Sequence, residues 1–85
     1  LWVSSLMVNV KLYAGLRKFM PSDTELGDFF QYEFQGSTVS DLLKTLGIKE
    51  VHVQNVMING ERAIDFSETL AKDDLVSIFP PIGGG

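Results

Sequence analysis

Apolar side chains occupy every second position in residues 8–13 and again in residues 30–35. This alternation predicts half-buried strands, because successive side chains of a strand point to opposite faces of the sheet. Residues 75–79 show the same period, which would turn Phe79 away from the core and toward the surface. The pattern therefore predicts one strand near each end of the chain and a third between them.

Between Thr38 and Gly47 the apolar positions change to a helical spacing of three and four residues. The apolar face comprises Val39, Leu42, Leu43 and Leu46. Thr38 is a favourable N-cap, and Asp41 three residues later completes a pair that resembles a capping box. Gly47 ends the helix, and Ile48 falls where a Schellman motif places an apolar residue against Leu43. Start, face and end all predict one amphipathic helix.

After the helix, residues 51–54 alternate again, and after a shift of phase the pattern continues through residues 56–58, so one strand is predicted over this region. The dipeptide Asn59-Gly60 is the strongest two-residue signal for a β-hairpin turn. Residues 56–58 would form the strand before this turn and residues 62–64 the returning strand.

The order of these elements is strand, strand, helix, strand, short strand, strand. Residues 14–29 form a long connection with room for one short helical turn, and residues 65–74 form a polar connection. This order predicts an α+β fold, a β-grasp (ubiquitin-like) roll whose mixed sheet is covered by one principal helix. By analogy with that fold, the first and last strands would be parallel neighbours at the centre. A ferredoxin-like fold would need a second substantial helix, and residues 65–74 are a poor candidate.

An 85-residue chain is short enough for one domain only. Its first methionine is Met7, directly before the first alternating segment, so residues 1–6 are interpreted as a non-native leader. Residues 7–79 are expected to form the β-grasp domain and residues 80–85 a flexible C-terminal tail.

Composition narrows the possible partners. The net charge of −4 would repel nucleic acid and anionic membranes and would suit a basic surface on a protein partner. No apolar stretch approaches the roughly 20 residues that span a bilayer, so a cytoplasmic protein is expected. The chain has no cysteine, which excludes disulfides and thiolate chemistry. The single histidine, His52, cannot form a metal site alone and is interpreted as a surface strand residue.

No segment has the pattern of a catalytic centre. The serines and threonines lack a nucleophile-elbow motif, and the adjacent carboxylates Asp73 and Asp74 are more typical of a solvated turn. The remaining reactive group is the α-carboxylate of Gly85. Pro80 and Pro81 offer no N–H to a sheet and favour an extended exit. Residues 82–85 could then reach up to about 14 Å, and a chain without Cβ atoms can enter a narrow active site.

Four stretches together resemble the MoaD/ThiS family of ubiquitin-like sulfur carriers, and MoaD in particular: VNVKLYAGLRKF, STVSDLLKTLGI, VMINGERA and DDLVSIFPPIGGG. The resemblance implies a non-catalytic carrier subunit of a sulfurtransferase, the small subunit of molybdopterin synthase in molybdenum cofactor biosynthesis. An adenylating enzyme of the MoeB or ThiF type would use ATP to activate Gly85, which would then carry sulfur as a thiocarboxylate. The large, MoaE-like synthase subunit would supply the catalytic residues, in an expected heterotetramer. No bound cofactor is implied.

The same resemblance assigns partner contacts to the end of the chain. The partner-binding residues expected there are Phe79, Pro80, Pro81, Ile82, Gly83 and Gly84. Leu75 is expected to join them as a contact of the folded body that offsets the cost of ordering the tail. Two alternatives use the same tail: a carrier of the thiamine pathway, and a protein modifier that forms isopeptide bonds. A third belongs to another class, a passive β-grasp domain that binds partners through its sheet or hairpin edge and whose tail has no role.

Overall fold

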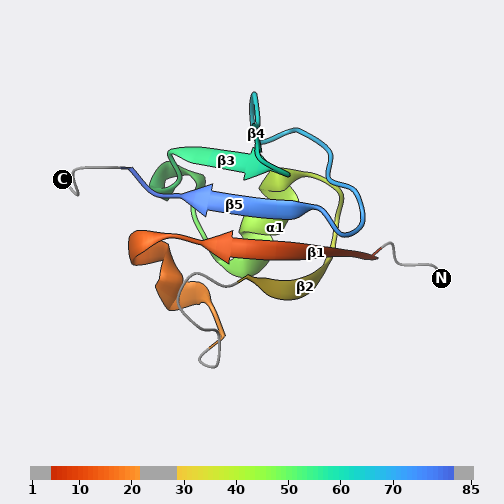
Figure 1. Cartoon of the computed structure of the whole chain (residues 1–85), viewed down its shortest axis with the longest axis horizontal. Coiled ribbons are helices and arrows are strands. Elements are labelled where there is room, and N and C mark those ends of the chain that lie inside the picture. The colour runs from red at the N-terminus through yellow and green to blue at the C-terminus, as the bar shows by residue number, and fades with distance from the viewer. Residues whose placement is uncertain (1–4, 22–28, 82–85) are drawn as a thin grey trace.

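A computed structural model describes residues 5–21 and 29–81 of the chain. Within these residues a five-stranded sheet lies in front of one α-helix (Figure 1). The elements are β1 (Ser5–Leu12), η1 (Ala14–Phe19), β2 (Phe30–Gln35), α1 (Val39–Leu46), η2 (Glu50–His52), β3 (Asn55–Ile58), β4 (Glu61–Arg62) and β5 (Leu75–Phe79), where η marks a 3-10 helix. This architecture confirms the predicted β-grasp fold.

The two strands at the centre of the sheet come from opposite ends of the described chain. The strand order is β2-β1-β5-β3-β4, and β1 and β5 are parallel whereas the other neighbours are antiparallel. The register places Lys11 beside Ser77 and Leu12 beside Ile78. The expected central placement of the first and last strands is therefore confirmed.

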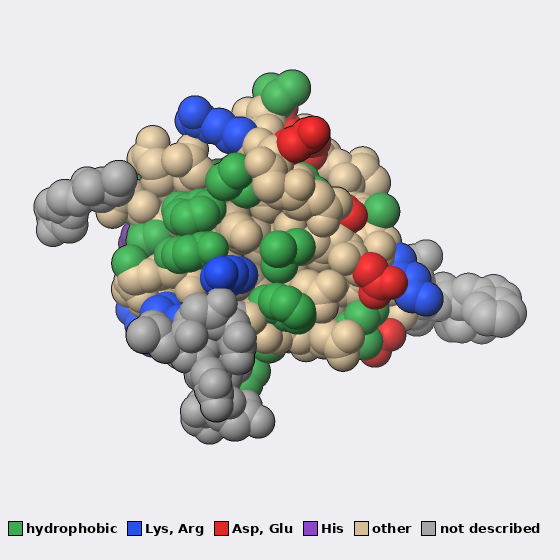
Figure 2. All heavy atoms as spheres, viewed as in Figure 1, with side chains coloured by type: hydrophobic (Ala, Val, Ile, Leu, Met, Phe, Trp, Pro, Cys, Tyr) green, Lys and Arg blue, Asp and Glu red, His purple; other side chains and the backbone are tan. Residues whose placement is uncertain are grey.

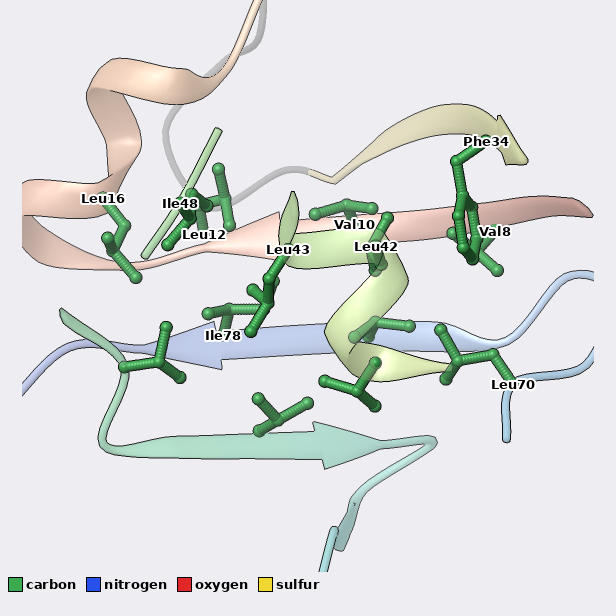
Figure 3. Packing of buried hydrophobic residues seen from close by; sticks show 14 residues of the cluster. Val8, Val10, Leu12, Leu16, Phe34, Leu42, Leu43, Ile48, Leu70 and Ile78 are labelled. Atoms are coloured by element: carbon green, nitrogen blue, oxygen red, sulfur yellow. The ribbon is translucent and has the colours of Figure 1, made fainter. Parts of the chain in front are cut away.

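The core lies between the sheet and α1. Alternate residues of the two central strands are buried on this side, among them Val8, Val10 and Ile78. Leu42 and Leu43 of α1 are fully buried against them, as Figure 3 shows. Each such side chain contributes about 1.5–3 kcal/mol by leaving water, so both predicted apolar faces are needed to hold the helix on the sheet.

The predicted helix boundaries are confirmed by the hydrogen bonds at both ends of α1. The Asp41 N–H donates to Thr38 Oγ1 (3.1 Å), and the Thr38 N–H donates to Asp41 Oδ2 (3.2 Å), which completes the capping box. At the other end Gly47 has a φ of 84°, and the Ile48 N–H donates to the Leu43 carbonyl (2.9 Å). This last bond is the signature of the Schellman motif.

Asp41 also stabilises the loop before the helix. The backbone N–H of Ser37 donates to Asp41 Oδ2 at 3.0 Å. This bond, followed by those from the backbone and hydroxyl of Thr38, holds the pKa of Asp41 below its ordinary value because each donor favours the charged carboxylate.

The strand predicted for residues 51–54 is wrong. The chain forms the 3-10 helix η2 there, and Val51 is 76% exposed. The buried residues of this segment are Ile48 and Val53, and a tight turn between them lets the chain reverse from α1 into β3. Two alternating valines are too short a pattern to distinguish a strand from such a turn.

Two further boundaries differ from expectation. The Asn59-Gly60 turn is confirmed, with φ values of 53° and 86°, but the returning strand is β4 at Glu61–Arg62, earlier than residues 62–64. At the start of the chain β1 begins at Ser5, which pairs with Gln35 of β2. Residues 5 and 6, assigned above to a leader, therefore belong to the sheet.

The short helical turn expected in the connection after β1 is η1, whose residue Leu16 is buried. Among the residues that the structure describes, no helix is long and apolar enough to cross a membrane.

Candidate functional site

The candidate site is the point where β5 leaves the sheet. The Gln54 N–H donates to the Phe79 carbonyl (2.8 Å), and the Tyr13 N–H donates to the Ile78 carbonyl (3.3 Å). The next two residues, Pro80 and Pro81, have no N–H with which to continue this ladder. The strand therefore ends at Phe79, as predicted, with Pro80 partly buried and Pro81 exposed.

Phe79 is held in place by an aromatic partner on the open face of the sheet. Its ring stacks on that of Tyr13 with a centroid distance of 4.2 Å and an interplanar angle of 16°. Lys11 Nζ lies 5.4 Å from the centre of the Tyr13 ring, within the range of a cation–π contact. Phe79 is only partly buried, so the expectation that it reaches the surface holds on this face. Figure 2 shows hydrophobic side chains gathered at this end of the sheet.

Leu75 occupies the opposite end of the same strand. It shares the open face with Phe79, but the two residues are four positions apart along the strand, a distance of about 13 Å. The Leu75 N–H donates to the Asn59 side-chain carbonyl (2.8 Å), next to the hairpin turn. A partner that contacts both residues must therefore lie along the whole length of β5.

The predicted site residues Ile82, Gly83, Gly84 and Gly85 lie outside the described residues. Their roles remain predictions, which are taken up under the proposed function.

A groove lies on the other side of the exit. It has a volume of about 490 Å³ and is bounded by η1, the end of α1, η2 and the two prolines. We call it the exit groove, and its described lining residues are Gly15, Leu16, Lys18, Phe19, Gly47, Lys49, His52, Pro80 and Pro81.

Neither neighbour of the exit was predicted from the sequence. Tyr13 is not one of the alternating apolar positions of residues 8–13, and its contact with Phe79 depends on the parallel register of β1 and β5. The exit groove joins residues that are far apart in the chain, so no local motif marks it. His52 is exposed, as predicted, but it belongs to η2 and lines the groove instead of standing on a strand.

Asp74 accepts hydrogen bonds from the Asn59 side chain (2.8 Å) and the Ala71 N–H (2.8 Å), so it stabilises a turn, as the sequence suggested. Within residues 5–21 and 29–81 no group of three or more His, Asp or Glu side chains could hold a metal ion.

The fold and the end of β5 together define the protein class. It is a ubiquitin-like β-grasp protein whose central strand ends in an aromatic residue that two prolines follow. The sequence matches the family model described as Mut7-C ubiquitin over residues 5–83, and the chain belongs to this family. A comparison with curated proteins gives no match.

Solved structures of ubiquitin-like proteins resemble the chain over nearly its whole length. The Haloferax volcanii HVO 2177 protein has a TM-score of 0.70 and 22% identity, over 95% of this chain and 88% of that one. The small archaeal modifier protein 1 (SAMP1) of Methanosarcina acetivorans has a TM-score of 0.65 and 25% identity, over 96% and 99%. A complex of subunits 1 and 2 of the molybdopterin-converting factor from Helicobacter pylori has a TM-score of 0.56 and 21% identity, over 94% and 100%. These likenesses confirm the ubiquitin-like resemblance seen in the sequence.

Proposed function

We propose that this protein is a sulfur carrier that holds sulfur as a thiocarboxylate on Gly85, and that it serves as the small subunit of a molybdopterin synthase. The observation that carries the proposal is the end of β5, where the sheet ladder stops at Phe79 and two prolines direct the chain away.

Sulfur would be loaded onto Gly85 in two steps. A carboxylate oxygen of Gly85 attacks the α-phosphorus of ATP on an adenylating enzyme of the MoeB or ThiF type, and pyrophosphate leaves. A sulfide nucleophile then attacks the carbonyl carbon of the acyl-adenylate, and AMP leaves. In the active site of a MoaE-like large subunit, the thiocarboxylate sulfur would attack a carbon of a pterin precursor and displace an oxygen leaving group. Water would then hydrolyse the resulting thioester, which leaves the sulfur on the precursor and returns Gly85 to its carboxylate. The complex of two subunits in the Helicobacter pylori structure supports such an assembly.

The stacked rings of Tyr13 and Phe79 lie where the tail leaves the sheet, and they are ordered before any partner binds. Ordering residues 82–85 in a partner's active site costs about 1–2 kcal/mol per residue, or roughly 4–8 kcal/mol in all. Contacts of the folded body must offset this cost. Phe79 and Tyr13 are already fixed against each other at the exit, so a partner can bind them without ordering them first.

Intact-mass analysis tests the proposal. The protein is incubated with the adenylating enzyme from the same genome, ATP and sulfide, and the expected product has one oxygen replaced by sulfur. A variant that lacks Gly84 and Gly85 should stay unmodified yet keep the midpoint of thermal unfolding, while Gly83→Ala serves as a control with the same end. Modification of the shortened chain would refute the proposal. So would a mass of the natural protein, purified from its own cells, that places residues beyond Gly85.

A second candidate is a ubiquitin-like protein modifier. The structures of SAMP1, at 25–28% identity, favour it, because they are more similar in sequence to this chain than the molybdopterin-converting factor is at 21%. In this case the activated carbonyl of Gly85 would be attacked by a lysine amine of a target protein, and AMP would leave. Mass spectrometry of native extracts for isopeptides that end in this chain's Gly85 separates the two: conjugates support the modifier, and a free thiocarboxylate without conjugates supports the carrier.

The other two alternatives, the thiamine-pathway carrier and the passive interaction domain, predict different experimental results. A carrier of the thiamine pathway would form the thiocarboxylate but would not transfer sulfur to the synthase subunit. A passive interaction domain would bind its partner equally well with and without Gly84 and Gly85.

A further inference from the structure

Charge is distributed unevenly between the two ends of the sheet. The end where β5 exits carries the described basic residues Lys11, Arg17, Lys18, Lys44 and Lys49. Glu50 belongs to η2, which bounds the exit groove. The other described acids lie toward the other end, and they are Glu33, Asp41, Glu61, Asp65, Glu68, Asp73 and Asp74. In Figure 2 the acidic side chains lie toward the right and the top, away from the left end where β5 ends. The protein is acidic overall, but the described lining of the exit groove contains Lys18 and Lys49 and no carboxylate.

The exit groove concentrates this local charge over an apolar floor. Leu16 is 4% exposed and forms part of the floor, together with Phe19 and the two prolines. Lys18 and Lys49 lie on the rim, and Lys18 Nζ is 5.5 Å from the centre of the Phe19 ring. An ammonium group beside apolar surface is less screened by water than one in open solvent, so a carboxylate that enters the groove gains more from it.

Gly15 lines the groove beside open space. A Cβ atom built on Gly15 would meet nothing within 4 Å, so the space beside it is empty. A partner side chain can therefore enter there without displacing the core.

We infer that the exit groove binds an acidic segment of the partner protein that handles the tail, with carboxylates beside Lys18 and Lys49 and an apolar side chain against Leu16 and Phe19. The identity of this partner rests on the proposed function, in which it is the adenylating enzyme. The binding also fixes orientation. An acidic partner is repelled by the far end of the protein and attracted at the exit, so encounters are steered toward the tail.

Two other occupants fit the groove less well. A nucleic acid is a long polyanion, and the net charge of −4 opposes its approach outside this one short groove. The chain's own residues 82–85 would lose about 4–8 kcal/mol of conformational entropy on docking. Exposed ion pairs return only up to about 1 kcal/mol each, which does not offset that loss.

Charge reversal with a matched control tests the inference. The double variant Lys18→Glu/Lys49→Glu is compared with Arg62→Glu/Lys72→Glu, which makes the same change in net charge at the other end. In adenylation by the enzyme from the same genome, we expect the groove variant to lower kcat/KM about tenfold, through KM, and the control to change it less than about twofold. Equal losses in both variants would show a general charge effect and overturn the inference.

Filling the groove gives a second, uncharged test. Gly15→Phe places a ring in the open space and should raise KM while leaving the midpoint of thermal unfolding nearly unchanged. Ala71→Phe is the control, because it adds the same ring at an exposed position of the other end, away from the groove. Full activity of a folded Gly15→Phe variant would show that nothing enters the groove and would overturn the inference.

A third experiment does not depend on sulfur chemistry. The acetylated, amidated peptide Asp-Leu-Asp-Leu-Glu is titrated into the full chain, and backbone amide shifts are followed by NMR. We expect saturable shifts at Lys18, Gly47, Lys49 and His52, and none with the matching Lys-Leu-Lys-Leu-Lys peptide. Shifts at these residues in a protein that shows no adenylation would refute the proposed function but would still support the exit groove as a binding site for an acidic segment. The absence of these shifts would refute the binding of an acidic segment in the exit groove and leave the proposed function untouched.

The same spectra distinguish the other occupants. Stronger shifts with an oligothymidylate than with the acidic peptide would make the groove a nucleic-acid site and overturn the inference. Shifts in the groove when Gly84 and Gly85 are removed would show that the tail itself occupies it, with the same consequence.

Discussion

The contact between Tyr13 and Phe79 should be measurable as a coupling free energy. The two rings are stacked at 4.2 Å on the open face of the sheet, where Phe79 is only partly buried. Stacked aromatic pairs contribute about 0.5–1.5 kcal/mol beyond the area that they bury. Phe79→Ala should therefore lower the free energy of unfolding by about 1–2 kcal/mol, less than the roughly 3–5 kcal/mol of a fully buried phenylalanine.

A double-mutant cycle isolates the stacking contribution. Urea unfolding at 25 °C is measured for the wild type, Tyr13→Ala, Phe79→Ala and the double variant. The expected coupling is at least about 0.5 kcal/mol, whereas independent sites add to within about 0.3–0.5 kcal/mol. For a domain of this size the Phe79 substitution would lower the midpoint of thermal unfolding by about 4–16 °C. A coupling near zero would show that the rings do not stack in solution and that the tail has no fixed base. A loss of 3 kcal/mol or more on Phe79→Ala, by the scale for buried rings, would instead make Phe79 a core residue.

Two predictions concern the ends of α1. The lowered pKa of Asp41 means that its contribution to stability is complete above the ordinary carboxyl pKa of about 3.9 and is lost as the pH falls through the folded-state value. The stability difference between wild type and Asp41→Ala, from urea unfolding at pH 6 down to pH 2, should therefore shrink toward the acid end, and a constant difference would contradict the role of the charge. Gly47→Ala should cost about 1–2 kcal/mol, because Gly47 has a φ of 84° and an added Cβ meets nothing within 4 Å, so the cost is one of backbone conformation alone. Gly15→Ala, whose Cβ also meets open space, is the control, and equal losses in the two variants would exclude a left-handed cap.

Local patterns predicted α1 well because its signals agree within a few residues. Thr38, Asp41 and Gly47 each act on the backbone next to them, and the apolar spacing describes a single continuous face. The strands β1, β2 and β5 were also found, because each has several alternating positions against the same core. The prediction failed at Val51, where two alternating residues were the whole signal and the need to reverse the chain determined a turn instead.

The candidate site, like the fold, could be predicted from the sequence only in part. The end of β5 could be predicted, because the proline at position 80 cannot extend a sheet whatever surrounds it. The Tyr13 ring beside Phe79 could not, since the contact joins two strands from opposite ends of the chain and depends on their parallel register.

The sequence by itself determined the element order, the caps of the helix, the core face of each main strand and the point at which the last strand stops. These features depend on residues that are neighbours along the chain. Only the tertiary structure decided which strands lie side by side, and with them the aromatic base of the tail and the basic groove of an otherwise acidic protein. Lys18 and Lys49 meet there because η1 and the end of α1 pack beside the same exit, and such a meeting leaves no periodic trace in the sequence.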